Sequence, residues 1–477
     1  MTKKGSSNVF IREKSFYKSF ALILLAIAGQ NLLSYGVNLV DNTMLGSFDQ
    51  AALAGNSLSD QVQFILTMVV GGLSQGVLIL GAQYYGRGQI APILKIIAVA
   101  LRAIVIFCFA MFLVCAIFPG TVIGLLTNDT QVKAEGAKLL RLVSFSFVFY
   151  GITTVLISAL RSVQSVRIGL ILSAITLGIS IVLNYIFIFG RFGLPRMGIL
   201  GAGIATVTTR ALELVIVLLY IHFREKTLVI HWKELLSWDQ SYWRDYRRTA
   251  FPVTASNAIW GLAMAIQAAI LGHLGADVTA ANAIALVTFQ IVSVICYGAA
   301  NAASVLMGNC VGRGDMTRIR QMTRTLQVIF PIMGLIASGL LFCSKGIIIQ
   351  FFQISPAAEA MAQQFMSILC VTVIGTSYQM AALSGIVCAG GDTKFILRND
   401  LIFQWLIVIP SALLSAFVFH FSPWVVFMCL KSDQVLKCVV AVFKVNSYNW
   451  VHSLTRSPEQ PANNTASCRS EICDDKA

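Results

Sequence analysis

The sequence is short of charged residues. Asp, Glu, Lys and Arg make up only 12% of its 477 residues, whereas apolar residues make up 57%. Soluble globular domains carry about 25% charged residues. Together with a mean hydropathy of +0.77, this shortage excludes a soluble protein and indicates a polytopic membrane protein.

Histidine and paired cysteine motifs are also scarce. No Cys-x-x-Cys or His-x-x-x-His pair occurs, and most of the 11 cysteines lie singly in apolar runs, where cysteine behaves as a small hydrophobic residue. An intramembrane enzyme would need acids, histidines or metal ligands that converge. The five histidines are instead dispersed, at His222, His231, His273, His420 and His452. We therefore expect no enzymatic activity, no cofactor and no resident metal.

Long apolar runs are abundant, and each helical crossing of a bilayer needs about 20 apolar residues. Twelve runs qualify, near residues 20–43, 56–80, 95–118, 138–160, 167–190, 198–222, 250–273, 281–307, 323–350, 364–388, 396–419 and 423–444. They predict an all-α polytopic membrane protein with twelve transmembrane helices.

The net charge of +14 would suggest a nucleic-acid partner in a soluble protein. With the N-terminus inside, however, 25 of the 35 Lys and Arg residues fall on the inner side, six on the outer side and four within spans. The positive-inside rule thus explains the charge and supports an even number of spans. We expect a multi-pass plasma-membrane protein with both termini cytoplasmic, partnered by the lipid bilayer and not by nucleic acid.

The chain contains an internal repeat with an offset of 226 residues. MLGSFDQAALAGN near residue 44 aligns with ILGHLGADVTAAN near residue 270, and Gly86-Arg87-Gly88 aligns with Gly312-Arg313-Gly314. Each half then holds six spans, which is the parallel-repeat plan of some secondary transporters.

The predicted organisation is a cytoplasmic segment 1–19, a first lobe 20–222, an inter-lobe linker 223–249, a second lobe 250–446 and a tail 447–477. The tail is rich in Ser, Asn and Pro, lacks apolar periodicity and is expected to be disordered.

One carboxylate, Asp41, lies near the end of the first apolar run. A charge at bilayer depth costs roughly 2.5 to 3.5 kcal/mol on insertion scales, so an intramembrane acid is a functional-site hypothesis. On a helix, Gln30, Ser34 and Asn38 fall on the same narrow stripe as Asp41. This stripe should face protein or water. The alternative is that Asp41 only caps the end of the helix.

Other polar residues in the spans leave two interpretations open. Asn184 and Ser180, one turn apart, either join helices by hydrogen bonds or belong to a site. Arg210 and Glu213 are expected to neutralise each other. Under the repeat, Asp41 corresponds to Gln267, so an ionisable group used for ion coupling would be present in only one lobe.

Several motifs in order resemble the multidrug and toxic compound extrusion (MATE) family. They are LVDNTMLG, AALAGNSL, the paired GRG turns, NYIFIFG followed by GILGAGIATVTTR, and CAGGDTKF. The resemblance implies a V-shaped pair of six-helix lobes around a cavity. It also implies export of cationic, amphipathic, drug-like small molecules in exchange for H⁺ or Na⁺.

The resemblance assigns ion coupling to Asp41, Asn184 and Ser180, with a Na⁺ position near Asp41. Three departures concern Ala26, Asn257 and Cys388, which stand where many members have Pro, Glu and Arg. Because Ala supplies no bend, a proline kink in the first helix is not expected. Ion coupling in the second lobe is weakly supported.

The substrate cavity is predicted from polar, aromatic and flexible side chains, which suit adaptable binding of cations, although each also suits plain packing. The predicted residues are Gln30, Ser34, Tyr35, Asn38, Tyr150, Asn257, Trp260, Met264, Gln267, Tyr297 and Tyr378. The alternatives are a flippase for a lipid-linked substrate, which would need a strongly cationic cavity, and a non-transporting sensor on a transporter scaffold. We expect a monomer.

Overall fold

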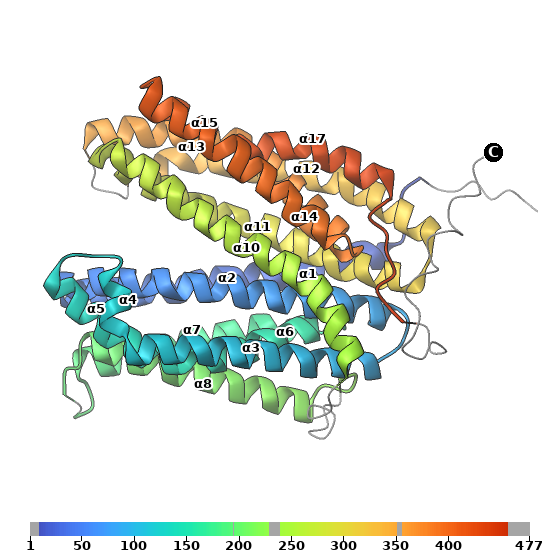
Figure 1. Cartoon of the computed structure of the whole chain (residues 1–477), viewed down its shortest axis with the longest axis horizontal. Coiled ribbons are helices and arrows are strands. Elements are labelled where there is room, and N and C mark those ends of the chain that lie inside the picture. Colours follow the sequence, from blue (N-terminus) through green and yellow to red (C-terminus); the bar gives the residue numbers. More distant parts are fainter. Residues whose placement is uncertain (1–8, 194, 229–238, 351–354, 457–477) are drawn as a thin grey trace, which may run out of the picture.

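The computed structural model describes residues 9–193, 195–228, 239–350 and 355–456, and these residues are almost entirely helical (Figure 1). Within them, 11 helical stretches are long and apolar enough to cross a membrane. The predicted class, an all-α polytopic membrane protein, is confirmed.

The first half of the chain forms α1 (Lys14–Phe48), α2 (Gln50–Gly86), α3 (Ala91–Ile117), α4 (Pro119–Gly124), α5 (Thr130–Val143), η1 (Ser144–Ser146), α6 (Phe147–Ser162), α7 (Arg167–Phe189) and α8 (Ile199–Phe223). The second half forms α10 (Gln240–His273), α11 (Ala276–Arg313), α12 (Met316–Gln350), α13 (Pro356–Met380), η2 (Ala381–Val387), α14 (Thr393–Asp400), η3 (Leu401–Val408), α15 (Ile409–Leu413), η4 (Leu414–Val418), α16 (Pro423–Lys431) and α17 (Asp433–Ser447). The segments η2, η3 and η4 are π-helical turns within longer helices.

The twelfth predicted span, 423–444, is not one continuous helix. It is divided at Ser432 into α16 and α17, which have 9 and 15 residues. The division lies beside Lys431, Asp433 and Lys437, which are all buried. Buried charges need partners, so this crossing is organised around polar contacts as well as apolar packing.

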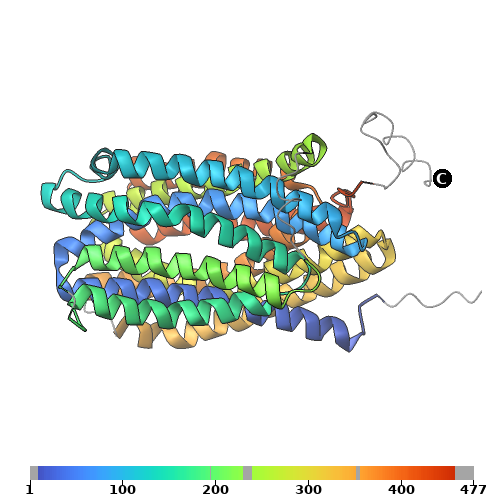
Figure 2. The same ribbon diagram turned by 90° about the horizontal axis from the view of Figure 1, so that it is seen from below.

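The helices form two bundles (Figure 1). One apolar core draws on residues from Leu45 to Ala250, and another on residues from Ile270 to Leu430. A third core joins the start of α1 and parts of α2 to α11, α12 and η2. In Figure 1, α10 and α2 lie close together near the start of α10 and diverge toward α4 and α5; Figure 2 shows the same helices from below.

The halves pack against each other through repeat-equivalent positions. A Cβ at Gly72 of α2 would lie 2.4 Å from the Cα of Thr254 on α10, and one at Gly298 of α11 would lie 2.9 Å from the carbonyl oxygen of Leu24 on α1. Gly72 and Gly298 are repeat counterparts. Glycine therefore allows α2 to approach α10, and α11 to approach α1, in equivalent ways.

The two GRG turns meet at one end of the molecule, here called the GRG end. A Cβ on Gly86 would come within 2.1 Å of the Asn309 carbonyl oxygen, and one on Gly312 within 2.0 Å of that of Gln83. Gln83 and Asn309 are themselves repeat counterparts. The Arg87 Nε donates to the Gly312 carbonyl oxygen at 3.2 Å. The backbones of α2 and α11 thus contact each other symmetrically at this end.

Part of the predicted disordered tail is ordered, which corrects that prediction. After α17, Trp450 is completely buried and the His452 N–H donates to the Gly390 carbonyl oxygen at 2.7 Å. Arg456 forms an ion pair with Asp245 on α10, with Nε and Oδ2 2.7 Å apart. A single buried aromatic residue therefore anchors a segment whose composition suggested disorder. The rest of the predicted disordered tail, 457–477, lies outside the described residues.

The predicted linker 223–249 is partly helical. α8 ends at Phe223, and α10 begins at Gln240; residues 229–238 between them lie outside the described part. The Asp239 side chain caps α10 by accepting from the Ser241 N–H at 3.0 Å. Partial burial favours a higher pKa for Asp239, but hydrogen bonds from Ser241 and Lys95 outweigh it and hold the pKa below its ordinary value.

Candidate functional site: a polar network in the first half

The centre of the site is the carboxylate of Asp41. The Asn184 Nδ2 donates to Asp41 Oδ1 at 2.5 Å, and the Ser180 Oγ donates to the same oxygen at 3.3 Å. Ser180 and Asn184 lie four residues apart, so both project from one face of α7, and α7 packs along α1. The three residues predicted for ion coupling are therefore in contact.

This cluster has unused acceptor capacity. The Asn184 Oδ1 is buried and accepts no hydrogen bond in the described structure. Among the described residues, no Lys or Arg lies within ion-pair distance of Asp41. A carboxylate and an orphaned amide oxygen side by side suit a proton or a hard cation with oxygen ligands.

A second carboxylate, Asp60 on α2, joins the same region and was missed by the sequence analysis. It accepts hydrogen bonds from Asn56 at 3.2 Å and from Gln63 at 3.1 Å. Asn56 also donates to Asn42, the neighbour of Asp41, at 3.0 Å. The signal was available, because Asn56, Asp60 and Gln63 form an i, i+4, i+7 stripe within the second apolar run.

Arg210 and Glu213 are close enough to interact electrostatically, but no direct ion pair joins them in the described residues. Arg210 donates instead to the Gln63 Oε1 at 3.3 Å and lies over the Tyr150 ring, 4.4 Å from its centroid. Glu213 accepts from the Thr176 hydroxyl at 2.8 Å. The two side chains project from α8 toward different helices. Tyr150, a predicted cavity residue, therefore contacts Arg210 in this structure.

The other stripe residues of α1 have different surroundings. Gln30 accepts a hydrogen bond from Arg161 at 2.6 Å, so it is bound within the first half. The Ser34 hydroxyl donates to the Gln30 carbonyl oxygen at 3.0 Å. Ser34 and Asn38 are both exposed, whereas Asp41 is only partly accessible. The polar stripe therefore runs from a bound end at Gln30 to accessible positions beside Asp41.

Four predicted cavity residues lie on helices that meet across the two halves. Tyr35 on α1 and Tyr297 on α11 are close enough to interact electrostatically. Asn257 donates to the Met68 carbonyl oxygen at 3.4 Å, and the rings of Trp260 and Phe64 are 6.4 Å apart. These contacts place aromatic and amide groups of α10 against α2.

The remaining predicted cavity residues lie inside the second half. Met264 and Gln267 line a cavity of about 20 Å³ with Phe427 and Lys431, which is room for about one water molecule. Tyr378 belongs to the buried core and donates to Gln327 at 3.0 Å. These three side chains are therefore packed in the second bundle in this structure.

Two acids of the second half, Asp400 and Asp433, share one lysine. Lys437 Nζ lies 2.9 Å from Asp400 Oδ1 and 3.4 Å from Asp433 Oδ2, and its side chain is only 5% exposed. Ser256 on α10 also donates to Asp400. These two carboxylates, which could have taken part in ion coupling in the second half, are thus neutralised by one lysine.

Comparison with known proteins agrees with the repeat and the fold. The family model MatE matches residues 26–186 and 252–414, two segments that start 226 residues apart. The chain is 25% identical over 338 residues to the probable multidrug resistance protein NorM of Thermotoga maritima, covering 70% of each chain. It is 23% identical over 422 residues to that of Agrobacterium fabrum, covering 86% of this chain and 89% of the other.

Solved structures show the same architecture. The eukaryotic MATE transporter AtDTX14 superposes with a TM-score of 0.82 at 19% identity, over 92% of this chain and 97% of that one. An outward-facing multidrug resistance MATE family transporter of the MOP superfamily gives a TM-score of 0.80 at 14% identity, over 92% of this chain and 99% of that one.

Proposed function

Since this chain belongs to the MATE family of multidrug efflux transporters, we propose that it is a secondary active antiporter that exports cationic amphipathic compounds in exchange for H⁺ or Na⁺. We place it in the plasma membrane as a monomer, with both termini in the cytoplasm. The observation that carries the coupling proposal is the Asp41 carboxylate, which receives two side-chain hydrogen bonds and has no ion-pair partner among the described residues.

Competition for Asp41 would couple the two flows. When Asp41 is ionised, its negative charge attracts a cationic substrate; when H⁺ or Na⁺ occupies it, that attraction is lost. Each ligand shifts the equilibrium between transport states only by its difference in affinity for them. The accessible Ser34 and Asn38 on the same helix give the substrate a polar approach.

The residues around Asp41 suit both coupling ions. For Na⁺, the oxygens of Asp41, Ser180 and the orphaned Asn184 Oδ1 are ligands of the right type. For H⁺, the carboxylate itself is the acceptor, and Ser180 remains its hydrogen-bond partner.

The test is export of a fluorescent cation from energised cells by Asp41→Asn. We expect export to be abolished at unchanged expression, because the amide neither titrates nor carries charge. Asp49→Asn is the matched control: Asp49 caps α2 through its side chain, Asn caps equally well, and one carboxylate is lost near the same site. Wild-type export by Asp41→Asn would contradict the proposal.

A further inference from the structure

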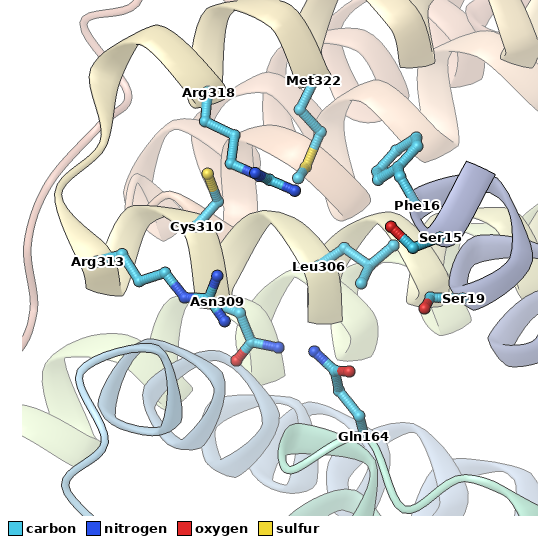
Figure 3. A pocket seen from close by; sticks show the side chains of 10 residues that line it. All are labelled: Ser15, Phe16, Ser19, Gln164, Leu306, Asn309, Cys310, Arg313, Arg318 and Met322. Atoms are coloured by element: carbon cyan, nitrogen blue, oxygen red, sulfur yellow. The ribbon is translucent and has the colours of Figure 1, made fainter. Parts of the chain in front are cut away.

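A second polar cavity lies at the GRG end, far along α1 from Asp41. Its volume is about 150 Å³, several times the roughly 30 Å³ that one water molecule takes up in the liquid. Ser15, Phe16, Ser19, Gln164, Leu306, Asn309, Cys310, Arg313, Arg318 and Met322 line it (Figure 3). These residues come from α1, the α6–α7 turn, α11 and α12, so both halves of the chain contribute.

Asn309 is the unusual member of this lining. It is 3% exposed, yet neither its Nδ2 nor its Oδ1 has a hydrogen-bond partner in the described structure. Its repeat counterpart, Gln83, is fully used: it donates to the carbonyl oxygens of Ala389 and His452 and accepts from the Leu454 N–H. Leaving a buried amide unpaired costs about 1 to 3 kcal/mol, so Asn309 lacks a partner that Gln83 has.

The cavity offers donors and positive charge. Arg313 has no hydrogen-bond or ion-pair partner among the described residues, and in Figure 3 its guanidinium group lies beside the Asn309 amide, with the Gln164 amide opposite. Arg318 also lines the cavity, but both of its terminal nitrogens are held by Glu13, at 3.2 and 2.8 Å. Ser15 belongs to the first turn of α1, which brings the positive end of the helix dipole to the lining.

We propose that this cavity binds a phosphate group, through the Asn309 amide N–H, the Arg313 guanidinium and the hydroxyls of Ser15 and Ser19. A phosphate supplies the several acceptor oxygens that these donors lack. Two sources share this chemistry, an anionic phospholipid headgroup and a free phosphate. The basic residues at this end belong to the predicted inner side, where anionic lipids are concentrated.

Occupancy would hold the two halves together at the GRG end. Gln164 and Ser15 belong to the first half, and Asn309 and Arg313 to the second, so one bound group would touch both. A ligand that contacts both halves only when they are close stabilises that arrangement by its difference in affinity. The site is distinct from Asp41, and binding to it is tested without measuring transport.

The experiment is native mass spectrometry of the purified full chain, titrated with phosphatidylglycerol, with phosphatidylcholine of the same acyl chains, or with inorganic phosphate. We expect saturable binding of one phosphatidylglycerol or one phosphate ion. Arg313→Gln should weaken it about tenfold, the loss expected for one charge-assisted contact of about 1.4 kcal/mol. Arg313→Lys should retain part of the affinity because it keeps the charge.

The matched control is Arg324→Gln, which removes the same charge from an exposed position of α12, on a different side of the helix from Arg318 and Met322. It should bind as the wild type does. Preference for phosphatidylglycerol would identify the lipid as the source, and binding of inorganic phosphate alone would identify the free ion. Equal binding of phosphatidylcholine, no saturable binding, or equal loss in both arginine variants would overturn the proposal.

A second variant separates binding from folding. Asn309→Leu removes the unpaired amide, so it should raise the melting temperature of the lipid-free protein and abolish the further rise that the ligand gives. A purely structural role for Asn309 predicts instead a lower melting temperature and an unchanged response to ligand. That outcome would contradict the assignment.

Discussion

In the first half of the chain, Asp41 lies against Ser180 and Asn184 with an orphaned amide oxygen beside it. At the equivalent position of the second half, Gln267 and Lys431 line a cavity of about 20 Å³, which is room for about one water molecule. The helix contacts of the two halves are nevertheless equivalent down to individual glycines. Duplication has therefore preserved the backbone contacts, whereas among the described residues Asp41 has no ion-pair partner and Asp400 and Asp433 share Lys437.

The largest effect should come from breaking the paired charges of the second half. Lys437→Met leaves the buried carboxylate of Asp433 and the partly buried carboxylate of Asp400 without their lysine. Removing one partner of a buried ion pair costs about 3 to 5 kcal/mol of stability. The melting temperature of the purified protein should fall steeply, whereas Lys394→Met, at an exposed position of α14, should leave it unchanged. Equal melting temperatures of the two variants would show that the ion pairs of Lys437 do not stabilise the fold.

The symmetric contact at the GRG end can be broken from either side. Gly86→Ala and Gly312→Ala each place a methyl group within about 2 Å of a backbone carbonyl oxygen of the other half, and overpacking of this kind costs about 1 to 3 kcal/mol. We expect similar losses in melting temperature for the two variants. Gly120→Ala, where nothing lies within 4 Å, is the control. A loss in only one variant would disprove the equivalence of the two turns.

Gln83 and Asn309 should respond in opposite ways although they are repeat counterparts. Gln83→Leu leaves three backbone groups without their hydrogen-bond partner, including the Leu454 N–H, which now donates to Gln83 at 2.8 Å. This loss should lower the stability by about 1 to 3 kcal/mol. Asn309→Leu removes no hydrogen bond of its side chain in the described structure. Melting temperatures of the two variants, measured without added lipid, check this difference. Equal destabilisation would mean that Asn309 also has a partner.

The smallest effect is expected from supplying the missing acid. Gln267→Asp places a carboxylate in the cavity that Lys431 lines, where the lysine should neutralise it. Export of a fluorescent cation should stay close to wild type, and the double variant Asp41→Asn, Gln267→Asp should remain inactive. Recovery of export in the double variant would show that either half can couple.

The sequence predicted the parts of this arrangement that depend on local spacing. The 226-residue offset found the equivalent glycines, and helical periodicity placed Asp41 on an accessible polar stripe, with Ser180 and Asn184 on one face of α7. Asp60 could have been found in the same way, from its spacing to Asn56 and Gln63.

The rest depended on which helices become neighbours. Nothing local to α8 indicates that Arg210 reaches Gln63 and Tyr150, whereas Glu213 reaches Thr176. Tyrosine is a residue type that suits a cavity wall, but the Tyr378 hydroxyl donates a hydrogen bond to Gln327 in the core. The order of the tail up to Arg456 likewise comes from one buried side chain, Trp450, and from partners far away in sequence.

Coupling of export to an ion through one carboxylate in the first half can be measured in vesicles reconstituted with the purified protein. Substrate flux is measured under an imposed pH gradient or an imposed Na⁺ gradient, for the wild type and for Asp41→Asn. We expect gradient-driven flux in the wild type with one of the two ions and none in Asp41→Asn with either. Gradient-driven flux that persists in Asp41→Asn, or wild-type flux that ignores both gradients, would contradict it.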